Sequence, residues 1–327
     1  MAPREIEIDF PIMRYDIMLP LLEGRVAMDG VRLRPVEVSS GPRGGGASNL
    51  ASGDFGLCDL NLSFFLPAIE AGWELIGLPI FPKRKPVYTY AFCRTAASIA
   101  TPKDLEGKRI GAGGRYSTII GIWLRGLLHD HYGVDNAKLH WLVWGDDAFP
   151  ARTPCAASVE AAPNLQKSPV DALFDDEIDA LMWDPVDLKL WETLEHSPLV
   201  KRLFPNYKDE DERLYRQTGI FTPVHIMVMS KKLDAQYPDL AARLYEAFNR
   251  SKELATEDQL TDLRGMGLMY LRERKQEEID RWGDLWKYGV RANQSAIDTF
   301  IRYSHKEGII SAKPSYNQLF AAGTLDT

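Results

Sequence analysis

Two side chains in this sequence are suited to moving protons, His225 and Asp59. His225 interrupts the apolar run IFTPVHIMV, and an imidazole titrates near neutral pH, so it can act as a general acid or base. The alternative is a core histidine hydrogen-bonded to backbone. In LCDLNLSFF, Asp59, Asn61 and Ser63 alternate with apolar residues and so share one face of a strand end. Asp59 is a candidate base for a phenolic hydroxyl, unless it and Ser63 only cap the following helix.

A second group of residues is suited to binding an anion. Arg84 follows a predicted strand end, where a guanidinium can bind a carboxylate through two hydrogen bonds. The alternative is a surface turn residue, because lysines flank it. A predicted strand over 108–112 leads through a glycine turn into a helix that opens near Ser117. This arrangement directs backbone N–H groups and the positive end of the helix dipole at one point, although it also suits an ordinary turn. The residues expected to contact an anion there are Tyr116, Ser117 and Thr118.

The sequence lacks the patterns of several other kinds of site. Neither nucleotide-binding pattern, GxxxxGK[ST] or GxGxxG, occurs, and neither does the GxSxG pattern of a serine nucleophile. No group of His, Cys, Asp or Glu has the spacing of a metal site. We therefore expect no metal and no cofactor. The formal net charge of −7 argues against a nucleic-acid partner.

The N-terminal segment, the apolar runs and the cysteines indicate where in the cell the protein is expected. The N-terminal segment MAPREIEIDFPIMRYD enters a strand pattern directly, without the features of a secretory leader. No later run approaches membrane-spanning length. Three widely spaced cysteines form no disulfide framework. We therefore expect a cytoplasmic protein with no membrane partner, and a homo-oligomer remains compatible with the sequence.

The order of predicted elements indicates two α/β lobes. Strand patterns at 5–10 and 31–38 enclose a short helix, which is typical of the opening of a parallel sheet. The glycine-rich stretch 39–53 is expected to be a mobile loop or a frayed helix. Further strands are predicted at 57–62, 75–81, 87–94, 108–112 and 139–144, with a long strand around His225. Amphipathic helices are predicted at 238–256, 276–286 and 294–307.

This order predicts a type II periplasmic-binding-protein-like fold, with two crossings between lobes and a C-terminal helical wrap. Lobe 1 would contain 1–92 and 221–327, and lobe 2 would contain 93–220. A ligand cleft would lie between them, at the carboxyl ends of the strands. The further residues expected to face that cleft are Tyr15, Tyr88, Trp183, Asp184 and Arg216. Trp183 is equally compatible with a core position and Arg216 with a hinge, and Arg125 is expected to form a structural ion pair.

Several sequence blocks, in order along nearly the whole chain, resemble the 4,5-dihydroxyphthalate decarboxylase family. These blocks are GLPIFPKR, GIWLRGLL, EIDAL, VKRLFPNY, YRQTGIF and WKYGVRANQSAIDTFIRYSHKEGI. The resemblance implies the same binding-protein fold and an acidic residue at the position of Asp59. Where family members commonly carry an Arg-His-Ser-like run, this chain has Val87, Tyr88 and Thr89. The histidine position would therefore be Tyr88.

Two functions follow from the sequence. The first is a cofactor-independent decarboxylase of a hydroxylated aromatic carboxylic acid, in which His225 protonates the ring carbon as CO2 leaves. The second is a solute-binding protein of an uptake system for a small organic anion, since one fold can serve both. In either case the partner is a small aromatic carboxylate. The missing leader pattern and the titratable His225 favour the enzyme.

Overall fold

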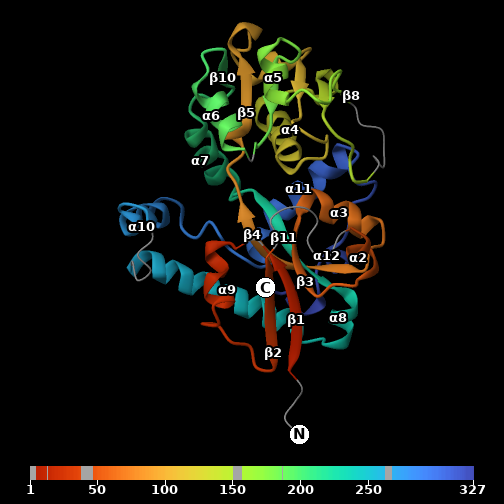
Figure 1. Ribbon diagram of the computed structural model, residues 1–327, viewed down its shortest axis with the longest axis vertical. Coiled ribbons are helices and arrows are strands. Elements are labelled where there is room, and N and C mark those ends of the chain that lie inside the picture. The colour runs from red at the N-terminus through yellow and green to blue at the C-terminus, as the bar shows by residue number, and fades with distance from the viewer. Residues whose placement is uncertain (1–4, 13, 38–46, 150–156, 186, 262–266) are drawn as a thin grey trace. The chain divides into compact units, whose positions relative to one another are not determined.

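The computed structural model describes the chain except residues 1–4, 13, 38–46, 150–156, 186 and 262–266 (Figure 1). The chain divides into two compact units. Unit 1 contains Met1–Arg84, Pro223–Gln294 and Pro314–Thr327, and unit 2 contains Lys85–Thr222 and Ser295–Lys313. Among the described residues, no helix combines the length and the apolar character needed to cross a bilayer.

Unit 1 contains two small sheets. In the first, β1 (Ile6–Ile12) pairs in parallel with β2 (Val31–Glu37). In the second, β11 (Pro223–Ser230) lies between β3 (Leu57–Asn61) and β4 (Leu75–Arg84), antiparallel to both, as Figure 1 shows. Nearly every residue of β11 is buried, which explains its continuous apolar sequence. The central strand of this sheet therefore comes from a part of the chain far from both of its neighbours.

Helices complete the core of unit 1. They are α1 (Leu19–Leu22), α2 (Ala47–Ser52), α3 (Leu62–Glu70), α8 (Lys231–Gln236), α9 (Leu240–Thr261), α10 (Leu271–Trp282) and α12 (Tyr316–Leu319). The apolar face of α9 packs on the strands; Phe248 and Phe10 meet edge to face with ring centroids 5.7 Å apart. Of the predicted mobile stretch 39–53, residues 47–52 form α2, and most of the rest lies outside the described residues.

Unit 2 is built on one six-stranded sheet in the order β10-β5-β9-β6-β7-β8. The strands are β5 (Ala91–Arg94), β6 (Arg109–Gly111), β7 (His140–Val143), β8 (Ser158–Ala161), β9 (Ala180–Met182) and β10 (Val200–Arg202). Its helices are α4 (Ile119–Tyr132), α5 (Pro169–Phe174), α6 (Leu188–His196), α7 (Tyr207–Thr218) and α11 (Gln294–Lys306). The strands β6, β7, β8 and β9 run parallel, so the segments that follow β6 and β9 leave the same edge.

The structure differs from two sequence expectations. The predicted strand 87–94 is interrupted, because Tyr88–Tyr90 form a 3₁₀ turn before β5. The helix predicted within the first lobe at 294–307 belongs to unit 2, since Ser295–Lys313 cluster with that unit. The reason is the apolar face of α11, which packs on α4. Trp123 of α4 lies 5.2 Å from Phe300 and 5.9 Å from Tyr303, measured between ring centroids.

The close approach of α4 and α11 depends on Gly126. A Cβ added there would lie 2.1 Å from Cδ2 of Tyr303, a ring that is 2% exposed and whose hydroxyl donates to Asp130. Glycine within a helix costs roughly 0.5–1 kcal/mol relative to alanine. Glycine at position 126 is therefore required by the packing of Tyr303, although it lowers the helix propensity.

We expect Gly126→Ala to destabilise the protein by about 1–3 kcal/mol or more, because the buried ring has no room to move away. Gly145→Ala is the matched control, since nothing lies within 4 Å of its added Cβ. Urea unfolding of both variants measures the difference. A Gly126→Ala protein as stable as the wild type would show that the two helices separate without cost.

Candidate active site

His225 and Asp59 meet where β11 pairs with β3. In the register of these strands His225 lies opposite Asn61, and Met227 lies opposite Asp59. The three polar side chains therefore project from one face of the sheet. The Nδ1 atom of His225 lies 2.6 Å from Oδ2 of Asp59. The Asp59 side chain is fully buried and that of His225 is 12% exposed, so only the histidine reaches the surface.

Tyr15 completes this cluster from the turn after β1. Its hydroxyl donates to Oδ2 of Asp59 at 2.8 Å and lies 3.2 Å from Nδ1 of His225. The two rings meet edge to face, with centroids 6.5 Å apart. Tyr15 is also the N-cap residue of the 3₁₀ turn Asp16–Met18, which sets the direction of its side chain. Three segments far apart in the sequence thus converge on one carboxylate oxygen.

The cluster defines how His225 can exchange protons. A carboxylate accepts hydrogen bonds and does not donate them, so Nδ1 carries the proton in the contact with Asp59. Proton exchange with a bound molecule would therefore use Nε2. Asp59 holds the ring in one orientation and balances the charge of an imidazolium. Nδ1 of His225 thus contacts a side-chain carboxylate and not the backbone.

The predicted roles of Asn61 and Ser63 change in the structure. Asn61, not Ser63, is the N-cap of α3: its Oδ1 accepts from the Ser63 backbone N–H at 3.0 Å and from the Ser63 hydroxyl at 2.8 Å. Asp59 does not cap the helix. At 1% exposure its carboxylate contacts Nδ1 of His225, and its role as a base for a phenolic hydroxyl stays a prediction.

Arg84 is buried and contacts protein groups. It is 6% exposed, and its Nη2 donates to the backbone oxygen of Lys287 at 2.7 Å and to Oδ1 of Asn293. Its guanidinium also lies 5.3 Å from the ring centroid of Phe81. The surface-turn interpretation is wrong because the residue is buried, and ligand binding by Arg84 stays a prediction. The residue instead attaches the segment 287–293 to the end of β4.

In unit 2, Tyr116 belongs to a buried network and does not present its hydroxyl to a ligand. The hydroxyl donates to Oε2 of Glu307, which also accepts from Nε of Arg125 at 2.9 Å. Nη2 of Arg125 donates to the backbone oxygen of Tyr116 at 3.0 Å, and Asn136 donates to Oε1 of Glu307 at 2.8 Å. The predicted structural ion pair of Arg125 is confirmed. Its partner, Glu307, lies 182 residues away and is not evident from the sequence.

The donors at the start of α4 already contact a carboxylate of this chain. The backbone N–H of Ser117 donates to Oδ1 of Asp147 at 3.0 Å, and the Ser117 hydroxyl donates to the same oxygen. Thr118 is the N-cap residue, but its side chain makes no cap hydrogen bond. The expectation that this turn attracts a carboxylate is consistent with its geometry, although the carboxylate is that of Asp147.

Trp183 and Asp184 follow β9 and contact other parts of unit 2. A Cβ on Gly113 would lie 2.0 Å from Cγ of Trp183, and Gly113 has a φ of 68°. The indole therefore packs directly on the glycine turn, which only glycine permits. Asp184 forms an ion pair with Lys85, whose ammonium lies 5.1 Å from the ring centroid of Tyr90. Both residues lie near the predicted turn, but their contacts are with protein groups.

Tyr88 and Arg216 contact other side chains of the protein in this structure. Tyr88 is 1% exposed and packs against Phe204, with ring centroids 4.7 Å apart. Arg216 lies on the exposed face of α7 and pairs with Glu212 at 2.6 Å. The position of Tyr88 is set by Asp211 of α7, whose carboxylate accepts from the N–H groups of Val87 and Tyr88. Burial raises the pKa of Asp211 to about 7, against the opposing effect of these two donors.

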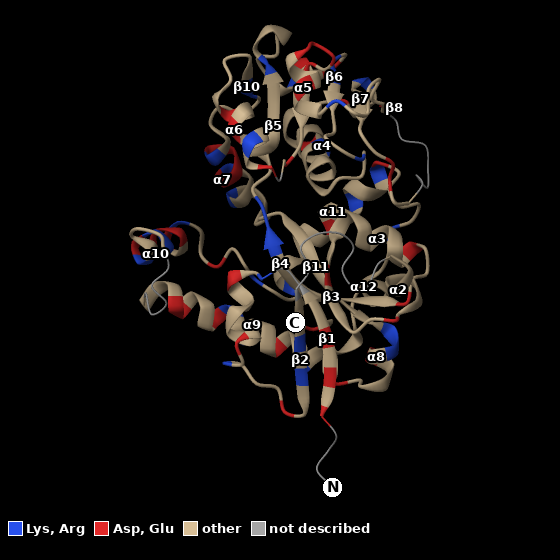
Figure 2. Cartoon of the chain, viewed as in Figure 1, with Lys and Arg blue, Asp and Glu red and all other residues tan. Residues whose placement is uncertain are grey.

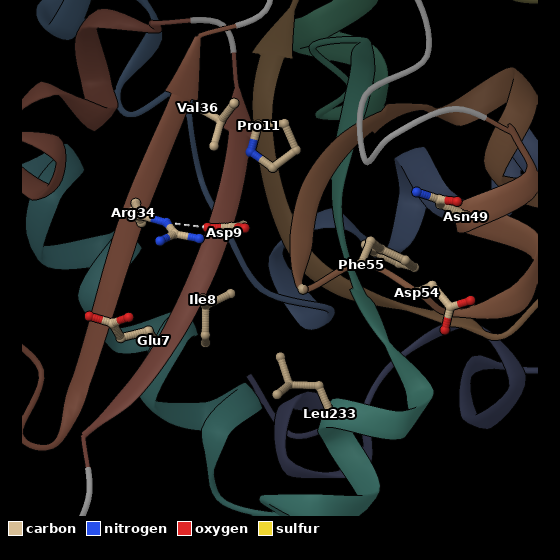
Figure 3. A pocket seen from close by; sticks show the side chains of 11 residues that line it. Glu7, Ile8, Asp9, Pro11, Arg34, Val36, Asn49, Asp54, Phe55 and Leu233 are labelled. Atoms are coloured by element: carbon tan, nitrogen blue, oxygen red, sulfur yellow. Dashed lines mark hydrogen bonds and ion pairs between the residues drawn. The ribbon is translucent and has the colours of Figure 1, made fainter.

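A separate hollow of about 720 Å³ lies beside β1 in unit 1 (Figure 3). Its described lining includes Asp9 and Arg34, which form an ion pair, together with Phe55 and Leu233. No predicted site residue is among the described residues that line it. Within the described part of the chain, no group of three or more His, Cys, Asp or Glu side chains is arranged to hold a metal ion.

Comparison with known proteins gives the relatives of this chain. No protein-family model matches it. Over 332 residues it is 27% identical to a protein of Comamonas testosteroni named 4,5-dihydroxyphthalate decarboxylase, covering 99% of this chain and 98% of that relative. This chain is a homologue of the 4,5-dihydroxyphthalate decarboxylases. A protein of the same name from Pseudomonas putida is 26% identical over 169 residues, which cover 50% of this chain and 64% of that relative.

Solved structures confirm the fold of this decarboxylase homologue. The periplasmic sulfonate-binding protein from Methylobacillus flagellatus superposes with a TM-score of 0.57 at 13% identity, covering 98% of this chain and 92% of that protein. The chain therefore has the predicted two-lobed type II periplasmic-binding-protein-like fold. At this identity the similarity shows the fold alone.

The raised pKa of Asp211 predicts a pH-dependent stability. Between about pH 4 and pH 7 the unfolded chain ionises this carboxyl while the folded chain keeps it protonated, so its contribution to the free energy of unfolding falls as the pH rises through that window. Asp211→Asn keeps an acceptor oxygen and removes the titration. Because Asp211 is only half-buried, we expect the variant to gain on the order of 1–3 kcal/mol over the wild type between pH 5 and pH 8.

Urea unfolding at the two pH values measures this gain. Asp209→Asn is the control, since Asp209 is exposed on the same helix. A constant difference between Asp211→Asn and the wild type at both pH values would show that Asp211 titrates normally.

Proposed function

We propose that the protein is a cofactor-independent decarboxylase of a hydroxylated aromatic carboxylic acid similar to 4,5-dihydroxyphthalate. The observation that carries this proposal is the contact of Nδ1 of His225 with buried Asp59 at 2.6 Å, which holds the ring of a partly exposed histidine in one orientation. The relative that matches nearly the whole chain, and the shorter match, are both named for this reaction.

The chemistry requires a proton at the ring carbon that bears the carboxylate. Nε2–H of protonated His225 would give its proton to that carbon. The hydroxyl para to this carbon would donate electrons and so stabilise the positive charge that protonation places on the ring. The carbon–carboxylate bond then breaks, its electron pair returns to the ring, and CO2 leaves. Hydrogen has replaced the carboxylate, and His225 regains a proton from solvent. Because the para hydroxyl relays the electrons, the proposed step requires no external electron sink.

Asp59 and Tyr15 would act through His225 and not on the substrate. The imidazolium formed beside a buried carboxylate has its charge balanced at 2.6 Å. The hydroxyl of Tyr15 donates to the same oxygen at 2.8 Å and so fixes the carboxylate. Such a preorganised proton donor does not have to reorient when the substrate binds. We therefore assign catalysis to His225 and positioning to the other two residues.

The second candidate function is a solute-binding protein for a small organic anion. The observation in its favour is the structural similarity to a periplasmic sulfonate-binding protein. A receptor requires hydrogen-bond donors and charge but no oriented proton donor. The two functions therefore differ in whether the His225–Asp59 pair is needed after the ligand is bound.

We expect His225→Asn to reduce kcat with 4,5-dihydroxyphthalate by about 10²–10⁴-fold while changing its affinity by less than about threefold. The asparagine amide can replace Nδ1–H toward Asp59, but nothing replaces Nε2. Release of CO2 and formation of 3,4-dihydroxybenzoate measure turnover, and calorimetry measures affinity. His140→Asn is the control, because His140 is an exposed residue at the start of β7.

Two results would count against the enzyme. Undiminished turnover by His225→Asn would remove His225 from the reaction. Tight binding of 4,5-dihydroxyphthalate by the wild type without any CO2 release would favour the solute-binding protein.

A further inference from the structure

Asn61 lies directly opposite His225 on the neighbouring strand β3. The pairing of β3 with β11 is regular over Leu57–Asn61, and directly opposite residues of antiparallel strands project from the same face, with Cβ atoms about 4.5–5.5 Å apart. The strand β11 contains no Lys, Arg, Asp or Glu, and Asp59 is the only such residue of β3, as Figure 2 shows. The side chain that these strands place beside the proposed acid is therefore a neutral amide.

The orientation of this amide is fixed by the chain itself. The backbone N–H of Ser63 donates to Oδ1 of Asn61 at 3.0 Å, and the Ser63 hydroxyl donates to the same oxygen at 2.8 Å. A backbone N–H can only donate, so the amide atom that it meets must be the oxygen and not the nitrogen. Nδ2, which carries two N–H donors, therefore occupies the other position of the amide.

The amide of Asn61 presents only donors to a bound molecule. Its side chain is only half-buried, and within the described part of the chain its hydrogen bonds are the two that Oδ1 accepts. An amide oxygen has two lone pairs, and both are used, whereas both N–H groups of Nδ2 remain for a ligand. The complement of such a side chain is a group that accepts hydrogen bonds and does not donate them.

We propose that Asn61 donates a hydrogen bond to the carboxylate that leaves, and that this donor selects a carboxylate against a carboxamide at that position of the ring. This inference rests on the proposed function, because it places the reacting carbon at Nε2 of His225. The departing carboxylate is bonded to that carbon, so it is the ring substituent next to a donor that lies directly opposite His225. A carboxylate only accepts hydrogen bonds, which matches the amide.

A neutral donor suits a group that must leave. A guanidinium would bind the carboxylate through two charge-assisted hydrogen bonds and would stabilise the substrate more than the transition state, in which charge has moved to the ring. A single amide holds the group with less of this penalty, and it keeps the reacting carbon beside Nε2, which lowers the entropic cost of the proton transfer. Asn61 thus positions the substrate, and His225 remains the proton donor.

Two substitutions separate the donor from the helix cap that Asn61 also provides. Asn, Asp and Ser are comparable N-cap residues, so Asn61→Ser and Asn61→Asp both keep an acceptor for the backbone N–H of Ser63. The first substitution removes the amide donors, and the second replaces them with an acceptor oxygen. Circular dichroism and urea unfolding check that both variants are folded.

The probes are benzoate and benzamide, which have nearly the same shape and lack the hydroxyl that the reaction requires. In calorimetry we expect the wild type to bind benzoate at least about tenfold more tightly than benzamide, because hydrogen bonds to a charged acceptor are the stronger ones. Asn61→Ser should weaken benzoate binding about tenfold and benzamide binding less. Asn61→Asp should reverse the preference, because its second oxygen repels benzoate and accepts from the NH2 group of benzamide.

Asn164→Asp is the matched control. Oδ1 of Asn164 accepts from the backbone N–H of Gln166 at 3.0 Å, the same local contact that Asn61 makes with Ser63, but Asn164 is exposed and belongs to unit 2. We expect this variant to keep the wild-type affinities for both probes.

The outcomes distinguish this inference from the proposed function. A wild type that binds benzoate no better than benzamide, or an Asn61→Asp protein that keeps the wild-type preference, would overturn the role of Asn61. If the wild type released CO2 from 4,5-dihydroxyphthalate while Asn61→Asp kept that preference, the decarboxylase would stand and the donor would not. If no CO2 were released but the preference reversed, the carboxylate donor would stand and the decarboxylase would not.

Discussion

The contact between Asp59 and His225 is the constraint on which the candidate site depends. Its partners are 166 residues apart, and it forms only when β11 inserts between β3 and β4. A carboxylate with no exposed surface is costly unless it is paired and hydrogen-bonded. Asp59 therefore has a stable place only once His225 and Tyr15 have reached it. Assembly of the small sheet of unit 1 and assembly of the proton donor are the same event.

Unit 2 shows a related arrangement around a buried charge that is not part of the proposed reaction. Arg125 and Glu307 are 0% and 4% exposed, and both hold Tyr116 at the turn before α4. Because Glu307 comes from the segment after α11, the late part of the chain is required for the shape of this turn. Asp147 then occupies the donors of Ser117. Charged residues of the chain itself therefore shape the turn, and these residues, Arg125, Asp147 and Glu307, are far apart in the sequence.

The sequence predicted what local patterns determine and failed where register or remote partners decide. The alternation around Asp59 and the apolar run around His225 correctly indicated strands, and their polar side chains share a face. The burial of Arg84 against Lys287 and Asn293 could not be predicted, because those partners come from a segment about 200 residues away. Tyr88 was expected at a ligand from its position in the resemblance, and its packing on Phe204 could not be predicted because Phe204 comes from a distant segment.

The fold shared with sulfonate-binding proteins explains why binding features alone do not identify the reaction. A receptor gains from every strong contact with its anion, whereas a decarboxylase must hold the substrate without stabilising the carboxylate that leaves. An arginine in a fork-like contact with that group would serve a receptor and hinder an enzyme. Arg84 is buried and directed at Lys287 and Asn293, while Asp59 holds the ring of His225, whose side chain is 12% exposed. In the proposed reaction this held imidazole would supply the proton, which a receptor does not need.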